Sequence, residues 1–164
     1  MNKVIIIRGP LGIGKSTISK IITERVKGEY ISMDKVVDDN KLSAKCPKIG
    51  CISEENFIKA NEIIIPQIKE SIKEKSVIID GNFYHKSQID HLIKELSNYS
   101  IVVFTLKASV DICIERDSKR EKSCGEGAAC AVHNLVSRFD YGDIIDNSGN
   151  DMGNVLDEIM TAIK

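Results

Sequence analysis

The sequence predicts an α/β fold in which helices cover both faces of a parallel sheet. Short apolar runs alternate along the chain with longer segments whose apolar residues recur at helical spacing. Strands that alternate with helices in this way form a parallel sheet between two helical layers. The chain has 164 residues, of which 42% are hydrophobic and 29% charged, and these values are typical of a globular domain. We therefore expect a single domain over residues 1–164.

Five apolar runs predict the strands of this sheet. The run Val4–Ile7 is the clearest, because it is continuous, β-branched and followed shortly by a glycine. Such runs indicate strands that are buried on both faces. In chain order, the predicted strands cover residues 4–7, 30–33, 77–79, 101–106 and 144–145.

Six segments with apolar residues at helical spacing predict the helices. Their approximate bounds are 16–26, 53–72, 89–96, 110–119, 132–136 and 155–163. Ser53 is the expected N-cap of the second, since two glutamates follow it in the first turn. We expect Pro66 to kink this helix. Its predicted buried stripe consists of Ile58, Ile65, Ile68 and Ile72.

Two segments interrupt the alternation of strands and helices. Residues 38–52 are polar and contain Pro47 and Gly50, which predicts a loop or a small irregular insert. Residues 122–129 are glycine-rich and charged. We expect both segments to extend from the sheet and its helices.

The most specific motif lies between the first predicted strand and the first predicted helix. Residues Gly9–Thr17 read GPLGIGKST and fit G-x-x-x-x-G-K-[ST], the P-loop pattern. Its glycines let backbone N–H groups face a phosphate, Lys15 supplies a cation, and the Ser16 hydroxyl is suited to bind Mg²⁺. The flanking strand and helix disfavour the alternative, a glycine-rich turn with a surface lysine. The expected ATP-binding residues of the loop are Gly9, Leu11, Gly12, Ile13, Gly14, Lys15, Ser16 and Thr17.

Several function classes are disfavoured by what the sequence lacks. A dinucleotide-binding loop would need a glycine at Leu11, and a GTPase would need N-K-x-D where the chain has Asn40-Lys41-Leu42-Ser43. With 23 Lys+Arg against 24 Asp+Glu, broad capture of nucleic acid is not favoured, although a local basic cleft stays open. No apolar stretch approaches the ~18–20 residues of a membrane span, and the N-terminus does not read as a signal peptide. We expect a cytoplasmic protein with reduced cysteines and no membrane partner.

With this P-loop, the chain resembles the small-molecule kinases of the adenylate-kinase-like fold. That group includes shikimate, gluconate and adenylylsulfate kinases, chloramphenicol phosphotransferase and polynucleotide kinases. The resemblance covers nearly the whole chain. It implies a three-layer sandwich of the P-loop NTPase type with sheet order 2-3-1-4-5. It also implies an acceptor-side excursion at about 34–56 and a small lid at about 116–131.

Three polar residues after the second and third predicted strands carry this resemblance further. Asp34 corresponds to an aspartate that takes or orients the acceptor's hydroxyl proton in the relatives; the alternative is a helix N-cap. Asp80 resembles the carboxylate of a Walker B strand, which would hold Mg²⁺ together with Ser16 or bind a substrate hydroxyl. A β-turn Asp-Gly is the alternative for Asp80. Asn82 offers a neutral donor and acceptor to the substrate.

The arginines near the predicted lid form a second group. Arg116 and Arg120 share one helical face, and in the relatives the first such arginine packs on adenine while the second reaches the transferring phosphate. The alternative is a solvated face on which these arginines pair with acidic neighbours. Arg138 is a further candidate lid arginine that would touch the substrate. The run 143–149 contains the fifth predicted strand and a polar loop directly after it, and in the relatives this loop touches the adenine.

One departure from the relatives bears on the acceptor. The run Asp80-Gly81 followed by Gln88 resembles D-G-F-P-R-x-x-x-Q of nucleoside monophosphate kinases, but Tyr84 stands where their arginine clamps a phosphate. This predicts a neutral hydroxylated acceptor, although Lys35 or Lys86 could partly replace the arginine.

The function that the sequence predicts is transfer of the γ-phosphate of Mg-ATP to a hydroxyl of a small molecule. Two alternatives stay open, a polynucleotide or nucleoside 5′-hydroxyl kinase and a non-catalytic ATP-binding regulatory module. We expect a monomer or a weak dimer. A zinc site is a further alternative, although its cysteine spacings are wider than usual and free thiols are favoured. The cysteines concerned are Cys46, Cys51, Cys124 and Cys130.

Overall fold

A computed structural model describes residues 1–48, 50–149 and 151–164 and contains one five-stranded, all-parallel sheet. Its order is β2-β3-β1-β4-β5, so the α/β class and the strand order expected from the resemblance are confirmed. The central strand β1 pairs with both β3 and β4, which buries it on both edges as well as both faces. The strands are β1 (Lys3–Arg8), β2 (Glu29–Ser32), β3 (Val77–Gly81), β4 (Ser100–Lys107) and β5 (Asp143–Asp146).

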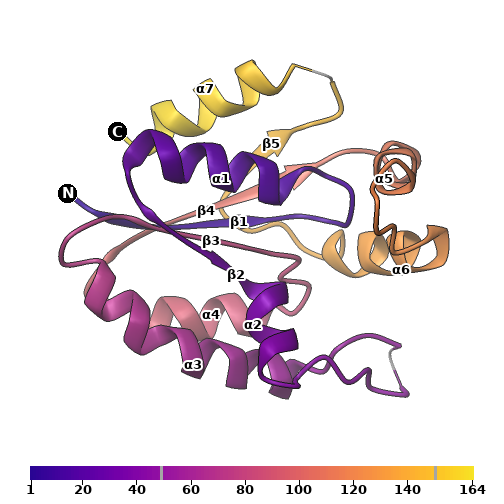
Figure 1. Cartoon of the computed structure of the whole chain (residues 1–164), viewed down its shortest axis with the longest axis horizontal. Helices are drawn as coiled ribbons and strands as arrows, with labels where there is room; N and C mark the ends of the chain where they lie inside the picture. Colours follow the sequence, from indigo (N-terminus) through magenta and orange to yellow (C-terminus); the bar gives the residue numbers. More distant parts are fainter. Residues whose placement is uncertain (49, 150) are drawn as a thin grey trace.

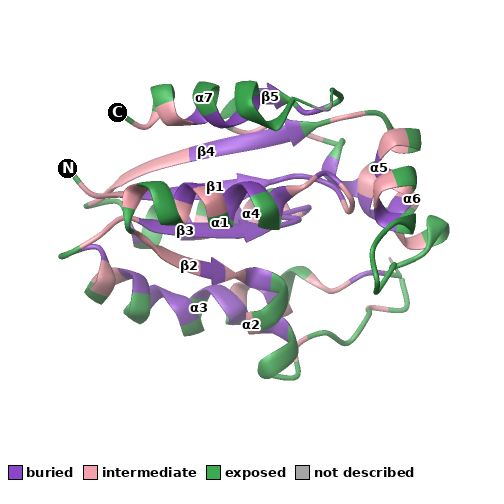
Figure 2. Cartoon of the chain, turned by 45° about the horizontal axis from the view of Figure 1, so that its top comes forward, coloured by how far each residue is buried: buried purple, intermediate pink, exposed green. Residues whose placement is uncertain are grey.

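Helices surround the sheet in two layers and at one end. Figure 1 shows α1 and α7 over one face, α2, α3 and α4 over the other, and α5 and α6 beyond the carboxyl ends of the strands. In Figure 2 the strands are largely buried between these layers, whereas the connection from α5 to α6 is exposed. The helices are α1 (Lys15–Val26), α2 (Met33–Asp39), α3 (Glu54–Ser71), α4 (Lys86–Glu95), α5 (Val110–Ser118), α6 (Glu126–Val136) and α7 (Met152–Ala162). None of the helices within the described residues is long and apolar enough to cross a membrane.

Two local features differ from the sequence prediction. Met33 begins helix α2 instead of ending a strand, because the Ser32 side chain caps the helix by accepting a hydrogen bond from the N–H of Lys35. Helix α6 begins at Glu126, so the second half of the predicted excursion 122–129 is helical. Both differences shorten the irregular segments around the carboxyl ends of the strands.

The buried stripe of α3 is shifted from the predicted one. Phe57 and Ile64 are buried together with the predicted Ile65 and Ile68, whereas Ile58 is only half-buried. The N-cap at Ser53 is confirmed, since its side chain accepts a hydrogen bond from the N–H of Asn56. Pro66 lies inside the helix, and the kink stays a prediction.

Arg8 is fully buried at the carboxyl end of β1 and ties the sheet to the end of α6. Its guanidinium donates to the Thr105 hydroxyl at 3.1 Å and to the carbonyls of Phe139 at 3.1 Å and Val136 at 2.9 Å. It also lies 4.3 Å from the centre of the Phe139 ring. Burial lowers the pKa of Arg8 to about 10, while the charge of Asp140 opposes the shift. A buried charge is tolerated only when it is hydrogen-bonded in this way, so Arg8 fixes where α6 ends relative to the P-loop.

Candidate active site

The P-loop turn depends on glycines at two positions. Gly12 has φ +77° and Gly14 has φ +94°, which are left-handed values that disfavour side chains. A Cβ on Gly12 would lie 2.2 Å from the carbonyl oxygen of Cys113 in α5, so the loop also packs closely against that helix. Gly14 is the N-cap of α1 and makes no side-chain cap, which leaves the first N–H groups of the helix without a side-chain acceptor. Such a helix start is suited to bind a phosphate.

Lys15 is held over this loop by two oxygen atoms. Its ammonium donates to the carbonyl of Pro10 at 2.8 Å and to the Asn82 side-chain oxygen at 3.0 Å. Lys15 is buried, and burial lowers its pKa while the nearby carboxylates Asp34 and Asp80 oppose the shift. The structure therefore brings together four predicted site residues, which are Lys15, Asp34, Asp80 and Asn82.

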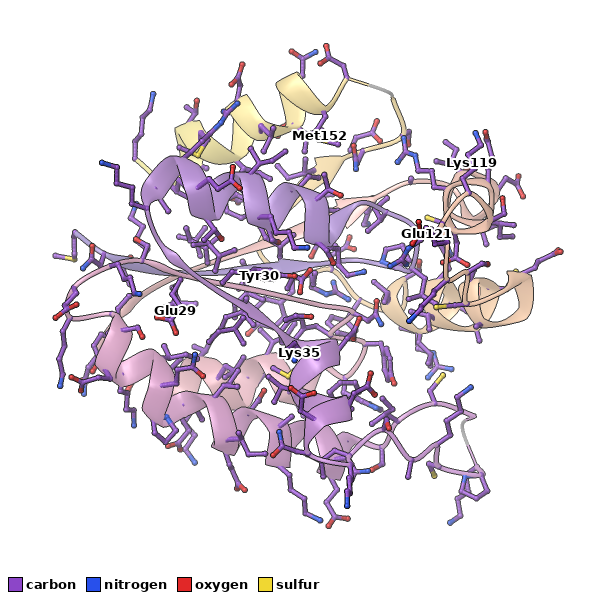
Figure 3. The ribbon with its side chains drawn as sticks, in the orientation of Figure 1. Glu29, Tyr30, Lys35, Lys119, Glu121 and Met152 are labelled. Carbon is purple, nitrogen blue, oxygen red and sulfur yellow. The ribbon has the colours of Figure 1, made fainter. Side chains whose placement is uncertain are left out.

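Asp80 lies at the carboxyl end of β3 and is 3% exposed. One of its carboxylate oxygens, Oδ2, is buried and has no hydrogen-bond partner among the described residues. Burial and the charge of Asp80 raise the pKa of its neighbour Tyr30, on β2 (Figure 3), to about 12. The unsatisfied oxygen of Asp80 and the exposed Ser16 hydroxyl, which both interact with Tyr30, form a donor set that fits Mg²⁺, an ion that prefers hard oxygen ligands and retains several waters.

The cysteines are not grouped as metal ligands within the described part of the chain. No set of three or more His, Cys, Asp or Glu side chains there is arranged to hold a metal ion. Cys46, Cys51, Cys124 and Cys130 are all free thiols. The alternative of a zinc site formed by these four therefore finds no support in the geometry.

A first cavity of about 270 Å³ opens over the P-loop. Arg116 and Arg120 line it together with loop residues, so both predicted arginines face the phosphate-binding turn. The loop residues in its lining are Gly12, Gly14, Lys15, Ser16 and Thr17. This arrangement can surround a polyphosphate with backbone N–H groups on one side and guanidinium groups on the other.

Arg116 is anchored to the segment that follows β5. Its guanidinium donates to the carbonyls of Asn147 and Gly149, each at 2.7 Å. Asn147 is buried and its amide donates in turn to the P-loop carbonyl of Ile13 at 2.6 Å. The sequence placed this segment near the nucleotide but did not single out the Asn147 side chain, which links the P-loop to α5. Its place in the polar run that follows a predicted strand was the only signal for it.

Arg120 pairs with Asp117, as the alternative reading of this face expected. The guanidinium lies 3.4 Å from the carboxylate of Asp117, which is itself buried. Asp117 also accepts hydrogen bonds from the Ser123 hydroxyl at 2.8 Å and the N–H of Cys124 at 2.9 Å, and so organises the turn from α5 to α6. Figure 3 labels Lys119 and Glu121, the two chain neighbours of Arg120, at the end of α5. Arg120 thus has both an acidic partner and a place in the cavity wall.

Arg138 is not brought to the P-loop. It is exposed just after the end of α6, and it lines neither the first cavity nor the second cavity described next. Since α6 ends where Arg8 fixes it, Arg138 lies on the outer side of that helix terminus.

A second cavity of about 460 Å³ lies between α2, Lys45, residues 50–52 and α6, and one residue of its wall is hydrogen-bonded to Lys15 in the wall of the first. Asp34 lines it from the first turn of α2, and Asn82, the partner of Lys15, lines it from the end of β3. Asp34 is open to solvent through the cavity, yet loss of water to the surrounding walls raises its pKa, and the charges of Asp80 and Asp38 add to this. The other lining residues are Leu11, Val37, Asp38, Lys45, Gly50, Cys51, Ile52, Phe57, Tyr84, Cys124, Ala128, Ala131 and Val132.

A strained residue directs two side chains into this second cavity. Phe83 has φ +46°, a left-handed value that is unfavourable for a bulky side chain, and its ring is fully buried. Its neighbours Asn82 and Tyr84 both line the cavity. The Tyr84 hydroxyl accepts a hydrogen bond from the N–H of Ile52 at 3.0 Å, which ties Ile52 to the residues that follow β3.

Residues 4–139 match the family model described as "AAA domain". Over 165 residues the chain is 30% identical to a Methanocaldococcus jannaschii protein named "Putative adenylate kinase", a match that covers 98% of this chain and 85% of that protein. The chain belongs to this P-loop kinase family. The chain is also 27% identical over 169 residues to the shikimate kinase of Clostridium beijerinckii, with 99% and 95% of the two chains covered. A solved sugar kinase from Janibacter sp. HTCC2649 shares the fold with a TM-score of 0.80 at 15% identity, covering 99% and 95%.

Proposed function

We propose that this chain transfers the γ-phosphoryl group of Mg-ATP to a hydroxyl group of a small molecule. The observation that carries the proposal is that Lys15, in the wall of the first cavity, donates a hydrogen bond to a residue in the wall of the second. Its ammonium lies over the P-loop and is held by Asn82, which belongs to the lining of the second cavity. A phosphoryl group on the P-loop would therefore lie beside any molecule that fills the second cavity.

The P-loop would hold the β- and γ-phosphates by its N–H groups and by Lys15. Ser16 and the unpartnered oxygen of Asp80 would hold Mg²⁺, which supplies charge neutralisation to the phosphate oxygens when bound. The donation of Lys15 to Asn82 keeps the ammonium at the loop before the nucleotide arrives. Prepositioning of this kind lowers the cost of organising the charges during transfer.

Asp34 would orient the acceptor hydroxyl toward the γ-phosphorus. The acceptor oxygen forms a bond to phosphorus while the bond to the β–γ bridging oxygen breaks, and ADP leaves with that electron pair. The hydroxyl proton passes to Asp34 and then to water. The raised pKa of Asp34 suits this task, since it makes the carboxylate a better proton acceptor than an ordinary aspartate.

Arg116 and Arg120 would close the nucleotide cavity from α5. Arg116 is held by the segment after β5, and this places its guanidinium at the edge of the cavity where the nucleoside of ATP would extend. Arg120 would exchange its contact with Asp117, at 3.4 Å, for the transferring phosphate. Exclusion of water by this lid protects the phosphoryl group from hydrolysis.

A nucleoside monophosphate is the second candidate acceptor, favoured by the identity with the M. jannaschii relative. The lining of the second cavity disfavours a phosphate-bearing acceptor, because the described lining residues include Lys45 but no arginine to clamp a phosphate. A nucleoside or polynucleotide 5′-hydroxyl would avoid that difficulty but would need a basic channel beside Asp34. A module that binds ATP without transferring its phosphate needs no acceptor at all.

The test is release of ADP from Mg-ATP in the presence of panels of hydroxylated metabolites, nucleosides, nucleoside monophosphates and RNA ends. We expect one hydroxyl panel to raise ADP release above the background, and Asp34→Asn to abolish the increase while ATP binding is kept. The matched control is Asp39→Asn, an exposed aspartate of the same helix that pairs with Lys35 outside the cavities. Stimulation by nucleoside monophosphates alone would establish the second candidate, and a silent Asp34→Asn would remove Asp34 from the mechanism.

A further inference from the structure

The second cavity contains two carboxylates at helical spacing. Asp34 and Asp38 are four residues apart on α2, so their side chains lie on the same face, and both line the cavity. The two carboxylates are close enough to interact, since the charge of Asp38 helps to raise the pKa of Asp34. Asp39, the next residue, faces elsewhere and pairs with Lys35 at 2.8 Å.

The two carboxylates differ in their access to cations. Asp34 is within the influence of Lys15 and Arg120 on its nucleotide side, and both lower its pKa. Asp38 lies one helical turn farther from these two cations, and it forms no ion pair with any described residue. Lys45, the one cation that the described residues add to the lining, is exposed on the neighbouring segment and pairs with neither carboxylate. The outer part of the cavity therefore contains one carboxylate, Asp38, that no described residue pairs with.

A neutral hydrogen-bonding group lies at the inner end of the cavity. Asn82 is 8% exposed, and its side-chain oxygen is occupied by Lys15 at 3.0 Å. Its side-chain amide Nδ2 donates to no group among the described residues, although it belongs to the cavity lining. A ligand oxygen placed between Asn82 and Asp34 would accept from the amide and donate to the carboxylate. This is the hydrogen-bonding pattern of a hydroxyl group, and a carboxylate or phosphate oxygen cannot complete it.

Between these polar ends the walls are apolar and fixed. The rings of Phe57 and Tyr84 meet edge to face with their centres 5.2 Å apart. Ala128, Ala131 and Val132 of α6 form the opposite wall. Because Tyr84 is held by Ile52 at 3.0 Å, the aromatic wall is preformed. A preformed apolar wall of this kind suits a ligand with an aromatic or branched aliphatic body.

We propose that the acceptor is an amino alcohol: a hydroxyl compound with a protonated amine and an apolar body, and with no anionic group. This rests on the proposed function, because Asp34 and Asn82 would receive the reacting hydroxyl. Asp38 binds the ammonium one helical turn away, and Phe57 and Tyr84 contact the body. An anionic acceptor of the same size would meet the unpaired Asp38 and is rejected.

The test uses three probes that share a phenyl ring on a three-carbon chain and differ in net charge. Phenylalaninol, 3-phenylpropane-1,2-diol and 3-phenyllactate each carry a phenyl ring and a hydroxyl, together with an ammonium, a second hydroxyl or a carboxylate. Their affinities are measured by ligand-observed NMR titration of the full chain saturated with Mg-ADP, at concentrations into the millimolar range. We expect phenylalaninol to bind roughly tenfold more tightly than the diol, as one close charge pair at a partly exposed site allows, and phenyllactate to bind more weakly than both.

Variants of α2 separate recognition from folding. Asp38→Asn should bring phenylalaninol to the affinity of the diol while the diol and Mg-ADP bind as before, whereas Asp39→Asn should change none of these values. A preference for phenyllactate, equal binding of the three probes, or binding of neither phenylalaninol nor the diol would overturn the proposal. If Mg-ADP and Mg-ATP fail to bind, the proposed function itself falls; if they bind and phenyllactate is preferred, only the acceptor class is wrong.

Discussion

Replacement of Asn82 by alanine tests the contact that joins the two cavities. The Lys15 ammonium is buried and has two hydrogen-bond partners, Pro10 at 2.8 Å and Asn82 at 3.0 Å. Removal of one leaves a buried charge half satisfied, and a hydrogen bond to a charged group contributes about 2 kcal/mol. For a chain of this length that loss lowers the melting temperature by roughly 4–8 °C.

The measurement is thermal unfolding of the unliganded protein, repeated with saturating Mg-ATP. The loss should shrink when nucleotide is bound, because the phosphates then supply partners to Lys15. Asn40→Ala is the matched control, since the Asn40 amide donates only to Val36 at the exposed end of α2, and it should shift the melting temperature by less than about 2 °C. If the Asn82 variant melts together with the wild type in the absence of nucleotide, Asn82 does not hold Lys15 and the link between the cavities is wrong.

Three other predictions concern the same edge of the sheet. Gly12→Ala should prevent ATP binding and destabilise the fold, because its Cβ would lie 2.2 Å from the Cys113 carbonyl; calorimetric titration and thermal unfolding check this. Arg8→Lys should lower the free energy of unfolding by about 2–4 kcal/mol in urea titrations, since a lysine cannot reach the partners on β4 and α6 together; unchanged stability would show that α6 is held otherwise. Because the pKa of Asp34 is raised, the folded state binds its proton more readily than the unfolded state, and the ionised carboxylate costs stability as pH rises through the window between the two pKa values. Asp34→Asn should therefore raise the melting temperature of the unliganded protein at neutral pH while transfer is lost, and a lower melting temperature would contradict the raised pKa.

The sequence correctly predicted those parts of the fold that are determined by residues close together in the chain. The strand before the P-loop, the loop itself and the helix after it follow from hydrophobic periodicity and from glycine geometry within one segment. Helix α2 was missed because seven residues are too few to show a helical period, and because its cap at Ser32 lies within what reads as a strand.

The roles of residues whose partners lie far away in the chain could not be predicted from the sequence pattern. Asn147 reaches the P-loop carbonyl of Ile13, which lies 134 positions earlier in the chain, and only the assembled sheet brings the two together. Nothing in the sequence around Arg8 indicates its role, because its partners come from β4 and from the end of α6. For the same reason the position of Arg138 outside the two cavities could not be predicted, since it depends on where α6 ends.

The most direct test of the central claim is a calorimetric titration of the full chain with ATP, in the presence and absence of Mg²⁺, for the wild type and for Lys15→Ala. We predict binding that Mg²⁺ strengthens in the wild type and an affinity at least about tenfold lower in the variant, because one charge-assisted contact to a phosphate is removed. Absence of Mg²⁺-dependent binding in the wild type, or equal affinity in the two proteins, would contradict the assignment of the P-loop as a nucleotide site.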